Sequence, residues 1–184
     1  RIWELGQLAG RRLRDRAHPF LQDLFDLTHE NVHMAVRAGT QTLYVDKIYG
    51  SRKVPAISRV GGRLPLHATA VGRVLLAAQP AWFIEAYLEK ELEAPTAKTM
   101  TDPHELAQVI HEVAVTGYSV TIEQMRVGAC SLALPVIVEG NTIAAVGMVL
   151  DKQHTSEINR LLPLLRGTVE RIQTALSGQP GRHK

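Results

Sequence analysis

Several features that would assign this 184-residue sequence to a class are scarce or missing. It has a single cysteine, Cys130, so an internal disulfide framework is excluded. Aromatic residues make up only 5% of the chain, and no apolar run approaches the roughly 18 residues of a membrane span. The sequence has no Gly-x-Ser-x-Gly elbow, no His-Glu-x-x-His and no Gly-Lys-Ser phosphate loop. We therefore predict a cytoplasmic protein that is not an enzyme, with no membrane contact, no metal and no cofactor.

The excess of basic over acidic residues is also small, since the formal net charge is only +3. With 45% hydrophobic and 21% charged residues, the chain is an ordinary globular sequence, long enough for one sizeable core. The basic excess lies near the ends, which favours a solvated helix face, although a linker that meets DNA phosphates remains an alternative. The sequence starts within a helical pattern and without methionine, so we expect a piece of a longer protein. The basic residues near the start are Arg11, Arg12, Arg14 and Arg16.

The stretch from Gly61 to Ala78 carries the most information. Two glycines and Pro65 predict an irregular loop, and a helix of small residues follows, with Thr69 or His67 as its cap. The first N–H groups of a helix have no intrahelical partner, so this helix start is a candidate anion site.

Hydrophobic spacing predicts the remaining elements. Helical spacing runs from Ile2 to about Ala17, Pro19 breaks or kinks it, and a second helix ends near Thr28. The later helices begin at Pro80, at the Asp102 capping box and near Ile158, the last with Pro163 as a kink. The expected strands are 31–37, 41–48, 54–60, 118–123, 130–138 and 142–150, with a tight turn at Gly140-Asn141 before the last.

This order predicts an α+β fold with a largely antiparallel sheet of about six strands flanked by helices. The strand 142–150 is apolar on both faces and is expected inside the sheet.

Residues with catalytic or metal-binding chemistry are isolated from partners. His33 has no second ligand at metal spacing, and His104 and His111 are two helical turns apart. Cys130 has no characteristic histidine motif nearby, so a buried structural thiol is the preferred interpretation and a cysteine-dependent hydrolase the alternative. What remains is a pocket formed by the Ala68–Val71 helix start, the strand opening at Gly128 and the small-residue strand at Gly147. Close packing of helix on sheet explains the same small residues equally well.

The run Gly-Gly-Arg-Leu-Pro-Leu-His-Ala-Thr-Ala-Val-Gly-Arg-Val-Leu-Leu-Ala at 61–77 closely resembles the signature of the effector-binding domain of IclR-type transcriptional regulators. The resemblance extends to Asn31–Val36, Tyr44–Ile48, Gly117–Val120 and Val127–Val136, and the first residues resemble the family's linker. It implies a GAF-like effector domain, with residues 1–29 as linker and first helices, 30–177 as the effector-binding domain and 178–184 as a flexible tail. The winged helix-turn-helix would lie upstream, and family members form homodimers or homotetramers.

Carrying over the family's effector contacts places an organic acid at the helix start. The family's acidic residue, cysteine and serines are replaced here by smaller or less polar groups, which implies a bulkier, less polar ligand. The implied effector-binding residues are Leu64, Ala70, Val71, Thr121, Ala129, Ser131, Gly147 and Val149. The resemblance implies a regulator that contacts DNA only through the missing N-terminal domain. A GAF-like dimerisation module without ligand is a further alternative.

Overall fold

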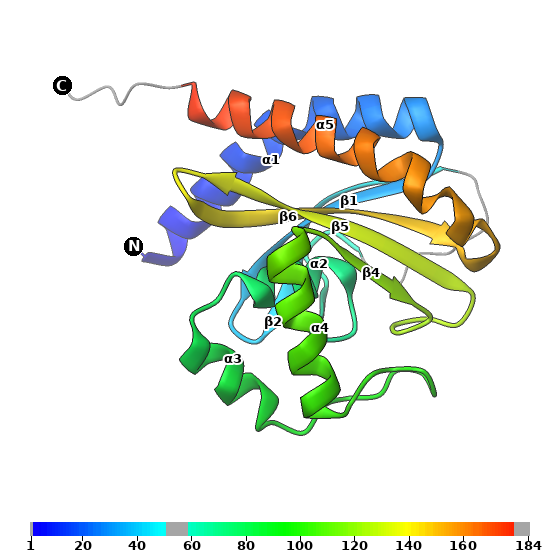
Figure 1. Cartoon of the computed structure of the whole chain (residues 1–184). Helices are drawn as coiled ribbons and strands as arrows, with labels where there is room; N and C mark the ends of the chain where they lie inside the picture. The colour runs from blue at the N-terminus through cyan, green and yellow to red at the C-terminus, as the bar shows by residue number, and fades with distance from the viewer. Residues whose placement is uncertain (1, 51–58, 179–184) are drawn as a thin grey trace.

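The computed structural model describes residues 2–50 and 59–178, with side chains described from residue 10 onward. A single sheet with strand order β3-β2-β1-β6-β5-β4 runs through the molecule, and every neighbouring pair is antiparallel. Helices α1 and α5 cover one face, and α2, α3 and α4 lie on the other (Figure 1). This arrangement confirms the predicted α+β fold. The strands are β1 (Asn31–Ala38), β2 (Gln41–Ile48), β3 (Arg63–Pro65), β4 (Ser119–Ile122), β5 (Ala129–Val138) and β6 (Asn141–Asp151).

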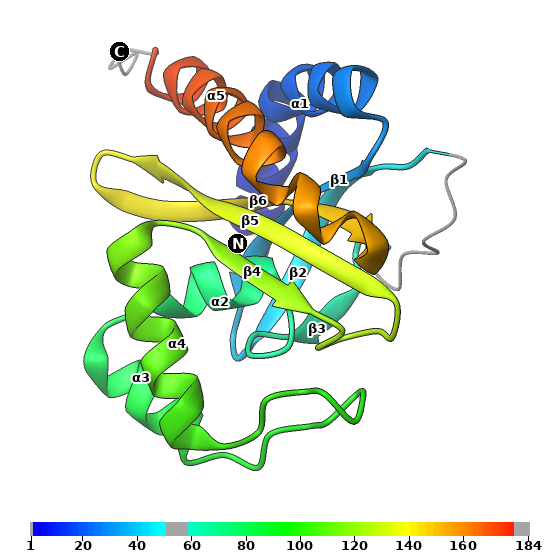
Figure 2. The same cartoon turned by 45° about the vertical axis from the view of Figure 1, so that its right-hand side comes forward.

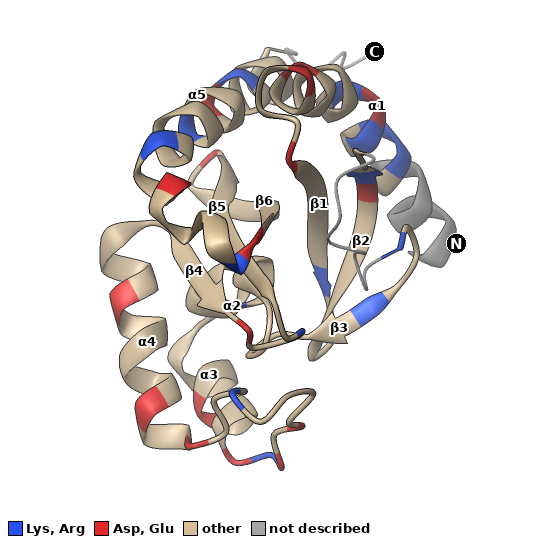
Figure 3. Ribbon diagram, turned by 90° about the vertical axis from the view of Figure 1, so that its right-hand side faces the viewer, with Lys and Arg blue, Asp and Glu red and all other residues tan. Residues whose placement is uncertain are grey.

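The helices are α1 (Ile2–Thr28), α2 (Ala70–Ala77), α3 (Ala81–Leu88), α4 (Pro103–Thr116) and α5 (Ile158–Ser177), with a 3-10 segment, η1 (Lys152–Glu157), before α5. Figure 2 shows α1 and α5 side by side across the sheet. The sheet curls, with α2 in its concave side, and basic and acidic residues both occur along α1 and α5 (Figure 3). None of the helices in the described ranges is long and apolar enough to cross a membrane.

Two hydrophobic clusters form the core, one on each face of the sheet. Between α1, α5 and the sheet lie Leu21, Met34, Leu132 and Met148 among others, and α2, α3 and α4 bury a second cluster around Leu66 and Leu76. Strand β6 lies between β1 and β5, which explains why its sequence is apolar on both faces.

Of the predicted break or kink at Pro19, the break is wrong. Helix α1 continues from Ile2 to Thr28 with Pro19 inside it. Proline removes one backbone hydrogen bond, but Leu21 and Leu24 are fully buried beyond it, and each buried leucine contributes about 1.5–3 kcal/mol. Packing of the second half of the helix therefore offsets the cost of the proline.

Two further predictions need correction. Residues 54–58 of the predicted third strand lie outside the described residues, Arg59 and Val60 are irregular, and the strand that pairs with β2 is Arg63–Pro65. The hairpin turn before β6 is Glu139-Gly140, one residue earlier than predicted, since both have positive φ and Val138 pairs with Asn141. From residue 179 the predicted tail is outside the described part of the chain.

Candidate functional site

The start of α2 is capped as the sequence predicts. Thr69 is the N-cap, and its Oγ1 accepts a hydrogen bond from Gly72 N–H at 3.1 Å. Ala70 and Val71 are buried in the first turn, where a helix leaves its N–H groups without intrahelical acceptors. These two amides therefore point the positive end of α2 into the interior.

Three of the predicted effector-binding residues form one row across the sheet. Thr121 pairs with Ser131, and Ser131 pairs with Val149, on neighbouring strands β4, β5 and β6. Because side chains alternate along a strand, Ala129 and Gly147 lie on the same face as this row, two residues away. This is the face that α2 covers, since Ala133 and Ala145 of the same parity belong to the α2 cluster.

At Gly147 the sheet and α2 approach each other closely. A Cβ built on Gly147 would lie 2.5 Å from Nε2 of His33 and 2.9 Å from Cγ1 of Val71. The space directly over Gly147 is therefore filled by the imidazole of His33 and by Val71. An opening for a ligand has to lie beside this contact, toward the Thr121–Ser131–Val149 row or toward Tyr44.

His33 is a functional candidate that the sequence analysis considered only as a metal ligand and set aside. Its side chain is 4% exposed, and Nδ1 has no hydrogen-bond partner within the described residues. Burial, aided by the nearby positive charge of Lys47, lowers the pKa of His33 from 6.5 to about 3, so the imidazole is neutral at neutral pH. The sequence carries only a partial signal, namely the alternation along β1, which puts His33 on the same face as Ala35. The pairing of His33 with Gly147 on the distant strand β6 is set by the fold.

Tyr44 is a second buried polar side chain, and it lies between His33 and the N-cap residue Thr69. Its ring packs edge-on against His33 with centroids 5.1 Å apart. Burial raises the pKa of Tyr44, opposed by hydrogen bonds with Thr42 and Thr69. A buried neutral imidazole and a buried phenol thus lie next to the N-cap of α2, and both can hydrogen-bond a polar guest.

Leu64 comes from the opposite edge of the sheet. It pairs with Thr42 on β2 and packs against the α2 cluster, whereas Thr121 lies on β4 at the other edge. The two residues share the α2 side of the sheet through its curl rather than through a common row.

Cys130 lies on the face of the sheet away from α2. It is fully buried, and its cross-strand neighbours are Ile122 and Leu150. Burial raises the pKa of the Cys130 thiol, and a hydrogen bond with Thr155 lowers it by a smaller amount. The thiolate needed for nucleophilic catalysis is therefore disfavoured, and the structural interpretation of Cys130 holds.

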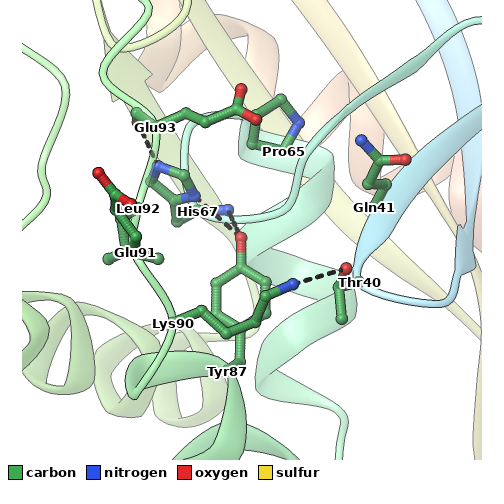
Figure 4. Close-up of a pocket in the computed structure, with 9 residues that line it drawn as sticks. All are labelled: Thr40, Gln41, Pro65, His67, Tyr87, Lys90, Glu91, Leu92 and Glu93. Atoms are coloured by element: carbon green, nitrogen blue, oxygen red, sulfur yellow. Dashed lines mark hydrogen bonds between the residues drawn. The ribbon is translucent and has the colours of Figure 1, made fainter.

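A small polar cavity of about 80 Å³ opens near His67, between the β1–β2 turn, β3 and α3 (Figure 4). Both imidazole nitrogens of His67 already have partners: Nδ1 lies 2.9 Å from Tyr87 Oη, and Nε2 lies 2.8 Å from the Glu93 carbonyl oxygen. Lys90 Nζ donates to Thr40 Oγ1 across the opening. This volume holds only a few waters, and His67 serves to join the signature loop to α3.

No group of three or more His, Cys, Asp or Glu side chains suited to a metal ion occurs within residues 10–50 and 59–178. Two of the arginines near the start are engaged with the body: Arg14 pairs with buried Asp46 at 3.5 Å, and Arg16 donates to the Ala175 carbonyl.

Comparison with known proteins matches residues 6–174 to the family described as the bacterial transcriptional regulator IclR C-terminal region. The Pca regulon regulatory protein of Pseudomonas putida is 32% identical over 164 residues, which cover 86% of this chain and 56% of that protein. An IclR homologue from Microbacterium hydrocarbonoxydans, solved in complex with 4-hydroxybenzoate, superposes with a TM-score of 0.90 at 29% identity, covering 97% of this chain and 75% of that one.

A third comparison is the inducer-binding domain of the PobR transcription factor from Acinetobacter, a double mutant in complex with 3-hydroxybenzoic acid. It has a TM-score of 0.77 at 28% identity and covers 85% of this chain and 95% of that one. The chain spans just over half the length of the P. putida relative. The signature at 61–77, the shared fold and the family match over 6–174 agree. This chain belongs to the IclR family of bacterial transcriptional regulators and corresponds to the C-terminal domain of that family.

Proposed function

We propose that this chain senses a small organic acid with an apolar body and thereby regulates a DNA-binding partner domain. The observation that carries the proposal is the unpartnered Nδ1 of His33, buried beside the start of α2. A buried polar atom without a partner is costly and rare in native proteins, so a ligand that pairs with it gains affinity.

The two ends of this site select different groups. The N–H groups of Ala70 and Val71 suit a carboxylate, because a helix start favours negative charge. The neutral His33 imidazole suits a hydroxyl, to which it can donate or from which it can accept. Val149, two residues along β6 from the filled position at Gly147, would supply apolar surface between them. A hydroxylated aromatic acid fits this set, and the hydroxybenzoates bound by the two structural relatives are of that class.

Regulation of DNA binding would require segments outside this chain. A helix-turn-helix domain joined to α1 would read the operator in the cytoplasm, and a homodimer or homotetramer would place two such domains on DNA. The effector would stabilise one arrangement of α1 against the body, and a coupling of about 1–3 kcal/mol is enough for this. Such coupling exists only if the effector binds the two arrangements unequally.

Isothermal titration calorimetry with 4-hydroxybenzoate and benzoate tests the proposal. Saturable binding of 4-hydroxybenzoate is expected, with His33→Phe reducing its affinity about tenfold and leaving that of benzoate nearly unchanged. Val71→Trp should abolish binding of both acids at this site. Val115→Trp makes the same change in size on the exposed side of α4 and should bind as wild type. Equal affinity of wild type and His33→Phe for 4-hydroxybenzoate would refute the role of His33.

One observation favours a second function, a dimerisation module without ligand. His33 and Val71 already fill the space over Gly147. If none of a panel of aromatic and aliphatic acids raises the Tm and analytical ultracentrifugation finds a dimer, this second function replaces the first.

A further inference from the structure

A second cavity lies on the other side of α2, against α4. Its volume is about 290 Å³, and its wall combines apolar side chains of α4 with the start of β4. None of the residues that carry the proposed effector site lines it. The residues that matter here are Arg73, Val109, Glu112, Val113, Thr116 and Ser119.

The positive charge in this cavity wall comes from Arg73 of α2, which is 3% exposed. Its Nε donates to the His67 carbonyl oxygen at 2.7 Å, and its Nη2 donates to Oε1 of Gln124 at 2.9 Å. Both acceptors are neutral, and within residues 10–50 and 59–178 no carboxylate pairs with the guanidinium. A guanidinium has five N–H donors, so most of its donors remain available. Burial lowers the pKa of Arg73 to about 10, and the group still carries its charge at neutral pH.

Ser119 supplies a second, independent sign of a missing partner. It is 2% exposed, and its Oγ has no hydrogen-bond partner among the described residues. Ser119 opens β4 and lines the same cavity as Arg73. One cavity wall thus holds a buried cation without a counter-ion and a buried hydroxyl without a partner. Together they indicate that an anion binds here.

We propose that this cavity binds a small monocarboxylate with a compact apolar body. The carboxylate accepts hydrogen bonds from Arg73 and Ser119, because a carboxylate offers several acceptor positions and pairs well with a guanidinium. The apolar body lies on Val109 and Val113. Glu112 is exposed at the rim of the cavity, where its negative charge disfavours a dianion.

Nuclear magnetic resonance on the 184-residue chain tests this with benzoate as the probe. A titration followed by amide resonances should give saturable shifts at Val113, Thr116 and Ser119. The shifts should persist in Val71→Trp, in which the proposed effector site is closed. Shifts confined to Ala70 and Val71 in the wild type, or their loss at Ser119 in Val71→Trp, would overturn the second site without touching the proposed function.

Two variants and a matched control test the contacts. Ser119→Val should weaken this benzoate binding about tenfold, since it removes a hydrogen bond to a charged group. Ser131→Val makes the same change in the row at the proposed effector site and should leave the shifts at Ser119 as in wild type. Glu112→Gln should strengthen the binding a few-fold by removing a repulsive charge. Unchanged affinity in Ser119→Val, with the fold retained by circular dichroism, would overturn the proposal even if Arg73 variants fail to fold.

Discussion

His33 of β1 pairs with Gly147 of β6. The imidazole of His33 fills the space that a side chain at position 147 would occupy, with Nε2 2.5 Å from a Cβ built on Gly147. The contact fixes how closely α2 packs on the sheet, because Val71 lies against the same glycine. It also sets one wall of the proposed effector site.

Gly147→Ala should destabilise the protein by about 1–3 kcal/mol, because the added methyl overlaps His33 and Val71. In a His33→Ala background the methyl has room on the His33 side, so the cost should fall by at least about 0.5 kcal/mol. Urea unfolding of the four proteins of this cycle gives the coupling free energy. Additive effects of the two substitutions would show that His33 and Gly147 do not compete for space.

Acid should destabilise the protein partly through His33. Its pKa is about 3 in the folded protein against 6.5 ordinarily, so below pH 6.5 the unfolded state binds a proton that the folded state does not. The free energy of unfolding should therefore be unaffected by this group above pH 6.5 and should decrease as the pH falls from 6.5 toward 3. His33→Phe should show a smaller loss over that window, measured by urea unfolding at a series of pH values. Parallel profiles for the two proteins would contradict the assignment.

Pro19→Ala should stabilise the protein by up to about 3 kcal/mol, since it restores a backbone hydrogen bond inside α1. Pro103→Ala is the matched control, because Pro103 occupies the first turn of α4, where no hydrogen bond is lost. Pro103→Ala should destabilise the protein by about 0.4–1 kcal/mol, because alanine gives the unfolded chain more conformational entropy than proline does. Thermal unfolding compares the two, and a lower Tm for Pro19→Ala would mean that α1 depends on the proline.

Asp102→Ala should cost about 1 kcal/mol. The Asp102 carboxylate accepts hydrogen bonds from the N–H groups of His104 and Glu105, both at 2.9 Å, and so caps α4. Asp102→Asn keeps an acceptor and should lose only a fraction of this. Chemical denaturation distinguishes them, and equal losses would assign the effect to charge rather than to capping.

The sequence was sufficient where local chemistry decides the outcome. The Thr69 cap and the Asp102 cap are each set by residues within one turn, and both occur as predicted. It was insufficient at Pro19, where the local preference to break the helix is overridden by packing of Leu21 and Leu24 against the distant sheet.

The site shows the same division. Alternation along β5 predicts that Ser131 and Cys130 face opposite sides, but the choice of side depends on pairing with β6. The unpaired Nδ1 of His33 depends on three elements that meet only in the folded chain, namely β1, β6 and α2. The sequence of a single strand therefore could not indicate that His33 Nδ1 lacks a partner.

The most direct test of the effector site is a titration of the ¹⁵N-labelled protein with 4-hydroxybenzoate, followed at the amides of Ala70 and Val71 and at the imidazole of His33. We expect saturable shifts at both amides and at His33, with one dissociation constant that agrees with calorimetry. Calorimetric binding that leaves these three groups unshifted would contradict the site at the start of α2.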